Sequence, residues 1–239
     1  MGTQGLTHIS NNSYPGRGIV LGRNVDGEWV TIYWIMGRSN NSRNRIFKYK
    51  NNILSTEAAD PSLVEDPSLI IYNAMRGIGH NVIVSNGSQT DMIYDKLMLG
   101  SGFLASLEDE TFEPDAPNYT PRISGYVNKN EQCITLSIIK RNFTGDTDHC
   151  YYRYSKLPPG VGYCITTYMG DGDPLPSFHG DPILLPFVKG NAKEIANTYW
   201  NELDADNRVS LMARVNNNIG IIILANSDDA PVYSFQNRS

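Results

Sequence analysis

The stretch Trp29-Val30-Thr31-Ile32-Tyr33-Trp34-Ile35-Met36 is a run of apolar, β-branched and aromatic side chains that ends at Gly37. Runs of this composition, bounded by Gly, Asn or Pro, indicate β-strands. Nine other segments have the same character: 18–21, 69–75, 81–84, 123–127, 133–139, 149–154, 162–168, 209–215 and 219–225. The chain therefore predicts about ten strands, most of them joined by short turns.

Two segments instead show helical spacing. The first follows Ser88 and Thr90, either of which could cap its start, and the second begins with Asn191 and Glu194, which resemble a capping box. The apolar residues at helical intervals are Ile93, Leu97 and Leu104 in the first and Ile195, Tyr199 and Leu203 in the second. Many antiparallel strands with few helices predict an α+β sandwich of two sheets with helices on its outer faces.

The length and charge of the chain limit its class. A chain of 239 residues fits one layered domain or two small ones, and the Pro-rich segment 171–186 predicts a surface loop instead of a linker. A net charge of -5 and a pI near 5.4 argue against nucleic acid as a partner. No apolar run approaches the roughly 18 residues that a membrane span needs, and residues 1–15 show no signal pattern. The odd count of three cysteines fits a reducing compartment, so we expect a cytoplasmic protein.

The segment 37–45 places three arginines within eight residues of this acidic chain, separated by short polar side chains. Five basic residues and no acidic residue lie between Trp29 and Thr56, whereas 97–121 holds five acidic residues and no basic one. Because arginine offers a planar fork of donors that matches phosphate and carboxylate, we expect a small phosphorylated ligand here. A solvated polar loop with scattered ion pairs is the alternative.

Three other polar segments could contribute to a site. Segment 84–91 runs from a strand through Asn86-Gly87 into a helix, whose first backbone N–H groups could bind an anion or could simply be capped. In 69–76, period-two alternation predicts that Tyr72 and Arg76 share one face and could line a pocket, unless Tyr72 only packs. Segment 113–123 holds three prolines, two carboxylates and an arginine, which suits either a rigid site or a shielded sheet edge.

The sequence shows no metal-ligand motif, and Walker A and Rossmann glycine fingerprints are absent. The four histidines are dispersed along the chain: His8, His80, His149 and His179. We therefore expect neither a metal nor an organic cofactor.

Five motifs in one order carry a resemblance to a known family. They are Tyr14-Pro15-Gly16-Arg17-Gly18-Ile19-Val20-Leu21-Gly22-Arg23-Asn24, the segment 33–45 ending in Ser42-Arg43-Asn44-Arg45, Ile71-Tyr72-Asn73-Ala74-Met75-Arg76, Val84-Ser85-Asn86-Gly87 with Thr90-Asp91, and Thr120-Pro121-Arg122-Ile123. Together they resemble the archaeal-type inosine monophosphate (IMP) cyclohydrolase family. The resemblance runs from about Arg17 to Tyr168 and is weaker beyond.

That resemblance implies a four-layer αββα fold like that of the N-terminal nucleophile hydrolases, used without their nucleophile. It makes residues 1–239 a single domain, with 1–15 as an N-terminal extension. It also implies the last step of purine biosynthesis, in which 5-formamidoimidazole-4-carboxamide ribonucleotide closes to IMP and water. The expected partner is therefore a purine nucleotide. The family analogy and the exposed sheet edges make a homo-oligomer the expected assembly.

By the same resemblance, Arg45 stabilises an oxyanion, Tyr72 donates or relays protons, and Glu113 acts as acid or base. The expected substrate-binding residues are Arg23, Arg38 and Arg122 for the phosphate, Asp91 for the carboxamide or ribose, and Asn24, Asn73, Asn86, Gly87 and Thr120 for other polar contacts. The chain has one residue more than the family between Glu113 and Arg122, so Asp115 could replace Glu113.

Three other functions stay open at this point. The chain could act on a related nucleotide or amide, or bind purine nucleotides without turnover. It could also be a cleaved N-terminal nucleophile hydrolase, although no Ser, Thr or Cys directly follows Met1.

Overall fold

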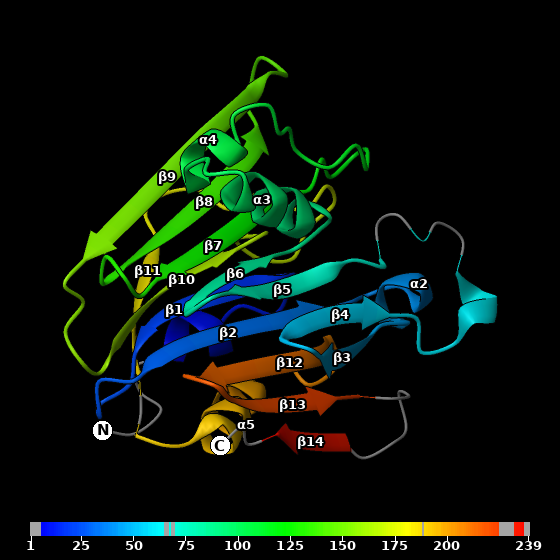
Figure 1. Cartoon of the computed structure of the whole chain (residues 1–239). Helices are drawn as coiled ribbons and strands as arrows, with labels where there is room; N and C mark the ends of the chain where they lie inside the picture. The colour runs from blue at the N-terminus through cyan, green and yellow to red at the C-terminus, as the bar shows by residue number, and fades with distance from the viewer. Residues whose placement is uncertain (1–5, 65–66, 68–69, 188, 225–231, 237–239) are drawn as a thin grey trace.

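The computed structural model describes residues 6–64, 67, 70–187, 189–224 and 232–236, which form two antiparallel seven-stranded sheets (Figure 1). Sheet A has the order β11-β10-β1-β2-β12-β13-β14, and sheet B runs from β3 to β9 in sequence order. The strands of sheet A are β1 (Gly18–Arg23), β2 (Trp29–Met36), β10 (Val161–Thr166), β11 (Ile183–Pro186), β12 (Arg208–Val215), β13 (Asn218–Ile223) and β14 (Val232–Gln236). Those of sheet B are β3 (Ile46–Lys50), β4 (Ile53–Glu57), β5 (Asn73–Ile78), β6 (Asn81–Ser85), β7 (Arg122–Asn128), β8 (Cys133–Arg141) and β9 (Thr147–Ser155).

Helices cover the outer faces of both sheets, so the described chain has four layers (Figure 1). Helix α5 (Ala192–Glu202) packs on β12 and β13 of sheet A, and α3 (Gln89–Met98) packs on β5 and β6 of sheet B. Three helices of one turn are α1 (Thr7–Ser10), α2 (Asn40–Arg43) and α4 (Phe103–Ser106), and a 3-10 turn, η2, spans Pro61–Leu63. Helix α1 contacts α5, and α4 contacts α3. The prediction of an α+β fold with two antiparallel sheets and few helices is confirmed.

Three apolar cores lie between the four layers. The central core takes side chains from both sheets, including Leu21 of β1 and Val127 of β7. A second core lies between sheet A and α5 and includes Trp34 and Trp200, and a third lies between sheet B and the α3–α4 pair. Because β2 sits in the middle of sheet A with a core on each side, all eight of its residues are buried. This explains the unbroken apolar run.

The predicted strand positions are largely confirmed, but four strands of the described chain were missed. Strands β3, β4, β11 and β14 fall in segments without a long apolar run. Strands β3 and β4 are short and half exposed, and β3 alternates apolar residues with Lys48 and Lys50 at the edge of its sheet. Charges on an edge strand hide it from an analysis that looks for apolar runs.

The predicted strand at 69–75 starts too early, and the prediction of which side chains share a face of it is wrong. Strand β5 begins at Asn73, and Leu69 lies outside the described residues. A bulge between Leu54 and Ser55 in the pairing of β4 with β5 breaks the alternation. As a result, Asn73 and Arg76 both contact the Asp91 carboxylate, instead of facing opposite sides.

Both predicted helices are present, with different boundaries. The capping box of Asn191 and Glu194 forms as expected, and Ile195, Tyr199 and Leu203 are buried. The first helix ends at Met98, so that Leu104 belongs to α4. The segment before β1 is packed, since Leu6 and Ile9 join the core under α5. No helix among the described residues is long and apolar enough to cross a membrane.

Candidate functional site

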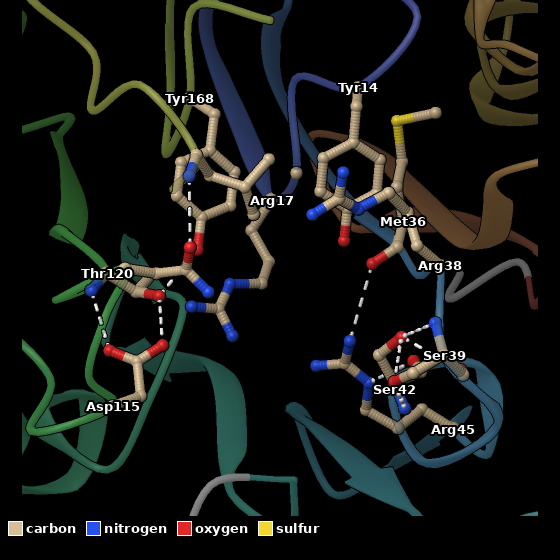
Figure 2. A pocket seen from close by; sticks show the side chains of 13 residues that line it. Tyr14, Arg17, Met36, Arg38, Ser39, Ser42, Arg45, Asp115, Thr120 and Tyr168 are labelled. Atoms are coloured by element: carbon tan, nitrogen blue, oxygen red, sulfur yellow. Dashed lines mark hydrogen bonds between the residues drawn. The ribbon is translucent and has the colours of Figure 1, made fainter. Parts of the chain in front are cut away.

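A cavity of about 520 Å³ opens where loops of the two sheets meet (Figure 2). Such a volume suits a ligand of nucleotide size. Its walls come from the segment before β1, the end of β2, the α2 loop, the loop before β7 and the segment after β10. The lining residues are Tyr14, Gly16, Arg17, Met36, Arg38, Ser39, Ser42, Arg45, Asp115, Asn118, Thr120, Tyr168 and Leu175. Three of them are arginines, which surround one open space in Figure 2.

Arg45 is a buried cation without a carboxylate partner among the residues that the structure describes. Ser39 and Ser42 form a capping box that fixes the one-turn helix α2. Arg45 Nε then donates to the Ser42 carbonyl at 2.8 Å, and Nη2 donates to the Met36 carbonyl at 3.4 Å. Burial lowers the pKa of Arg45, and Tyr72 opposes that change. A guanidinium held by carbonyls alone is prepared to bind an anion.

Arg17 forms a buried ion pair with Glu113. Its Nη2 lies 3.0 Å from each carboxylate oxygen, and Asn86 Nδ2 lies 3.3 Å from Oε1. Burial alone would lower the pKa of Arg17, but Glu113 reverses this and raises it well above its ordinary value. Burial raises the pKa of Glu113, while Arg17 opposes the rise. The site thus holds a buried carboxyl group whose pKa is raised above that of an exposed glutamate.

Two tyrosine hydroxyls meet behind the arginines. The hydroxyl of Tyr33, on β2, lies 2.7 Å from that of Tyr72, which precedes β5. Tyr33 is fully buried and Tyr72 is 6% exposed. Tyr72 interacts electrostatically with both Arg17 and Arg45. Tyr72 is therefore within reach of the charged groups that border the cavity.

A chain of hydrogen bonds shapes the opposite wall. Asp115 accepts from the Thr120 backbone N–H at 2.7 Å and also from the Thr120 hydroxyl. The Thr120 hydroxyl also bonds to the hydroxyl of Tyr168, and burial raises the pKa of Tyr168 to about 12. Figure 2 shows Asp115 below Thr120 and Tyr168 above it. Asp115 is thus used to hold its own loop, whereas Glu113 faces Arg17.

Arg38 lies at the mouth of the cavity and is partly exposed. Its Nη1 pairs with the Asp171 carboxylate and donates to the Gly172 carbonyl at 3.2 Å. Its guanidinium lies 4.8 Å from the centre of the Tyr14 ring. Because both partners of the ion pair are solvent-exposed, an incoming anion can compete with Asp171 for Arg38.

The structure brings six of the twelve predicted site residues to this cavity. Arg38, Arg45 and Thr120 line it, and Glu113, Asn86 and Tyr72 lie directly behind the lining.

The other six predicted residues lie elsewhere. Arg23 and Asn24 shape the β1–β2 turn at the far end of β1, through bonds to Gly27 and Glu28. Asn73 and Asp91 bond to each other beside Arg76 on the α3 side of sheet B. Gly87 packs against Arg122, which bonds to the Gln89 side chain and the Thr111 carbonyl. Arg17 stands just before β1 whereas Arg23 and Asn24 stand at its other end, so membership of one short motif did not bring these residues together.

The sequence prediction missed several residues of the cavity. Arg17 was noted only as part of a motif, although it is the partner of Glu113. Its position between Gly16 and Gly18 was the one sequence signal of close packing around Arg17. A side chain at Gly16 would collide with Tyr168, and one at Gly18 would collide with Trp34. Tyr14, Asn118, Tyr168 and Leu175 carry no local signal. No group of His, Cys, Asp and Glu that could hold a metal occurs among the described residues.

Comparison with known proteins gives a consistent family assignment. A family model described as IMP cyclohydrolase-like protein matches residues 14–220. Curated relatives named IMP cyclohydrolase include one from Methanosphaera stadtmanae, 28% identical over 79% of this chain and 85% of its own length. Another, from Methanococcus maripaludis, is 34% identical over 65% of this chain and 74% of its own length. A third, from Methanothrix thermoacetophila, is 30% identical over 66% of this chain and 76% of its own length.

The matched region begins at Tyr14, the first residue of the cavity wall, and extends past β12, so it includes every group described around the cavity. The chain therefore belongs to the IMP cyclohydrolase-like protein family.

Proposed function

We propose that this protein is an IMP cyclohydrolase, which closes the purine ring of 5-formamidoimidazole-4-carboxamide ribonucleotide to give IMP and water. The observation that carries the proposal is Arg45, a buried guanidinium without a carboxylate partner among the described residues, at the edge of a nucleotide-sized cavity. The names of the relatives support the same activity.

The reaction joins two groups of one molecule. The carboxamide nitrogen attacks the formyl carbon, the new C–N bond forms, and the formyl oxygen gains negative charge. Arg45 is our candidate for stabilising this oxyanion, a contribution of about 10²–10³ in rate for one donor in comparable sites. The cavity also holds the reacting groups against each other, which removes an entropic barrier.

Two protons must then move. The carboxamide nitrogen loses one proton as it becomes bonded to carbon, and the oxyanion gains one to become a carbinol. The formamido nitrogen loses the second as the ring C=N bond forms, and the carbinol oxygen gains a proton as it leaves as water. Glu113 is our candidate for removing the proton from nitrogen, because burial raises its pKa. Tyr72 is our candidate for donating to the departing oxygen. Glu113 first returns its proton to the oxyanion, which becomes the carbinol. It then takes the proton of the formamido nitrogen as water leaves and the ring C=N bond forms, and it passes that proton to Tyr72.

The substrate phosphate fits the mouth of the cavity. Arg38 is the most accessible of the three arginines there, and exchange of Asp171 for a phosphate would keep its charge balanced. Asn86 and Thr120 then hold two carboxylates that face the substrate. Asn86 donates a hydrogen bond to Glu113, and Thr120 donates one to Asp115. All catalytic roles fall to side chains of this protein, and we propose no metal or organic cofactor.

Four broader features belong to the same proposal. The four layers support a relation to the N-terminal nucleophile hydrolase fold. The central core shared by both sheets supports a single domain over residues 1–239. The free thiols of Cys133, Cys150 and Cys164 fit the cytoplasm, where purine synthesis would proceed. The open edges of both sheets would suit a homo-oligomer.

The test is turnover of the purified protein with the formamido ribonucleotide in a metal-chelated buffer, followed as IMP formation. We expect turnover by the wild type, and a kcat that is about 10²-fold or more lower, with a measurable remaining rate, in Arg45→Ala, Tyr72→Phe and Glu113→Gln while the substrate still binds. Tight binding without turnover by the wild type would refute the proposal in favour of a nucleotide-binding protein or an enzyme for a related amide.

A further inference from the structure

We infer that Tyr33 is a positioning residue for this reaction, which directs the proton of Tyr72 towards the substrate. The inference rests on the proposed function, since it concerns how Tyr72 acts in ring closure. It begins from the contact between the two hydroxyls, 2.7 Å apart across the gap between the sheets.

Tyr33 has few ways to satisfy its hydroxyl. Its side chain is fully buried on β2, and its ring packs against Phe47 with centroids 5.6 Å apart. Among the described residues its one hydrogen-bond partner is the hydroxyl of Tyr72. The charged groups that face it are Arg17 and Arg45, whose guanidiniums can only donate.

These facts fix the direction of the hydrogen bond. Burial raises the pKa of Tyr33 well above its ordinary value, so the phenol keeps its proton. An unmade bond from a buried hydroxyl costs about 1–3 kcal/mol, and the acceptor in reach is the oxygen of Tyr72. Tyr33 therefore donates and Tyr72 accepts. The proton of Tyr72 is left free to point away from Tyr33.

The backbone of Tyr72 holds the acceptor in place. Its N–H donates to the Thr56 hydroxyl at 2.9 Å, and its carbonyl accepts from the Thr56 N–H at 2.8 Å. The ring is thus fixed at its base by Thr56 and at its tip by Tyr33. A phenol held at both ends aims its proton within a narrow range, which is what donation to a departing hydroxyl requires.

The same contact acts as the proton leaves. When Tyr72 gives its proton to the carbinol oxygen, its own oxygen becomes negative. The Tyr33 hydroxyl then donates to a charged acceptor, a stronger bond than before, and the positive charges of Arg17 and Arg45 also interact with Tyr72. Tyr33 therefore lowers the barrier without touching the substrate, so it acts on kcat and leaves KM unchanged.

The experiment is a double-mutant cycle in the turnover assay with Tyr33→Phe, Tyr72→Phe and the double variant. We expect Tyr33→Phe to lower kcat by about 10- to 100-fold, the effect of one hydrogen bond to a charged group, with KM within about twofold of wild type. In the Tyr72→Phe background the same substitution should change the remaining rate by less than about twofold.

Tyr199→Phe is the matched control. Tyr199 is equally buried, on α5, and its hydroxyl has no hydrogen-bond partner among the described residues, so its removal should leave kcat unchanged. Thermal melts of all variants show whether each is folded. An unchanged kcat in folded Tyr33→Phe, or an equal loss in both backgrounds, would overturn the inference and leave the proposed function standing. An inactive wild type would overturn both.

Discussion

Arg17 Nη2 lies 3.0 Å from both carboxylate oxygens of Glu113, and this buried pair joins the segment before β1 to the loop before β7. The two residues are 96 positions apart in the sequence. Each charge is therefore stable in its buried position because the other is there, which makes the pair both a structural and a chemical unit.

Arg17→Met should destabilise the fold strongly. Removal of one partner of a buried pair costs about 3–5 kcal/mol, because the remaining charge is uncompensated. The double variant Arg17→Met with Glu113→Gln has no such charge and should recover part of that loss. Urea unfolding at pH 8 measures both free energies. Equal stabilities of the single and double variants would contradict this account of the pair.

The pH profile of kcat should have an acidic limb above pH 4.5, the ordinary pKa of glutamate. Burial raises the pKa of Glu113, so the carboxylate that we propose as the proton acceptor is lost at a higher pH than for an exposed glutamate. In Arg17→Met the limb should move to still higher pH, since the guanidinium that favours the charged form is gone. Steady-state rates between pH 4 and 9 test this, and a limb that moves downward would refute it.

Arg45→Lys should lower kcat by about 10²- to 10³-fold while the charge is kept, because an ammonium cannot bond to Ser42 and an oxyanion in the same geometry. Arg43→Lys is the control from the same loop. Arg43 bonds to the Gly37 and Asp206 carbonyls and does not line the cavity. Similar kcat values for the two lysine variants would contradict the proposed role of Arg45 in stabilising the oxyanion.

Asp171→Asn should tighten binding of the nucleotide about two- to fivefold, since the exposed partner that competes for Arg38 loses its charge. Arg38→Ala should weaken binding and reduce its dependence on salt. Glu131→Gln, which breaks the exposed pair with Arg153 far from the cavity, is the control. Titration calorimetry with IMP measures all four proteins. Weaker binding by Asp171→Asn would mean that this carboxylate contacts the ligand.

Gly18→Ala should destabilise the fold by about 1–3 kcal/mol, because an added Cβ would lie 2.0 Å from the ring of the buried Trp34. Gly102→Ala is the control, since nothing lies within 4 Å of a Cβ there. Denaturant melts compare the two. A wild-type midpoint for Gly18→Ala would show that the Trp34 ring can move aside at little cost.

The sequence predicted those features that depend on neighbouring residues. The apolar run of β2 and the capping box of Asn191 with Glu194 are local, and both were confirmed. The edge strand β3 was missed because Lys48 and Lys50 interrupt its apolar pattern, and β4 was missed because it is short and has only two buried residues.

The site was predicted in part, for a related reason. The resemblance named Arg45, Tyr72 and Glu113, whose roles stay predictions until the variants are tested. Nothing local marks the contact of Arg17 with Glu113 or that of Tyr33 with Tyr72, because each joins residues far apart in the sequence. The bulge next to β5, which reverses the facing of Arg76, likewise depends on the pairing with β4.

Those two contacts also link sheet A to sheet B through polar groups at the edge of the apolar central core. Gly125 of β7 lets the two sheets approach each other closely, because an added Cβ would lie 2.8 Å from Leu21 of β1. Any change in the spacing of the two sheets therefore also changes the alignment of the proposed proton-transfer groups. A shift of one sheet over the other by a fraction of an ångström would misalign these groups while the protein remained folded. We therefore expect catalytic activity to fall on heating at temperatures below the unfolding transition.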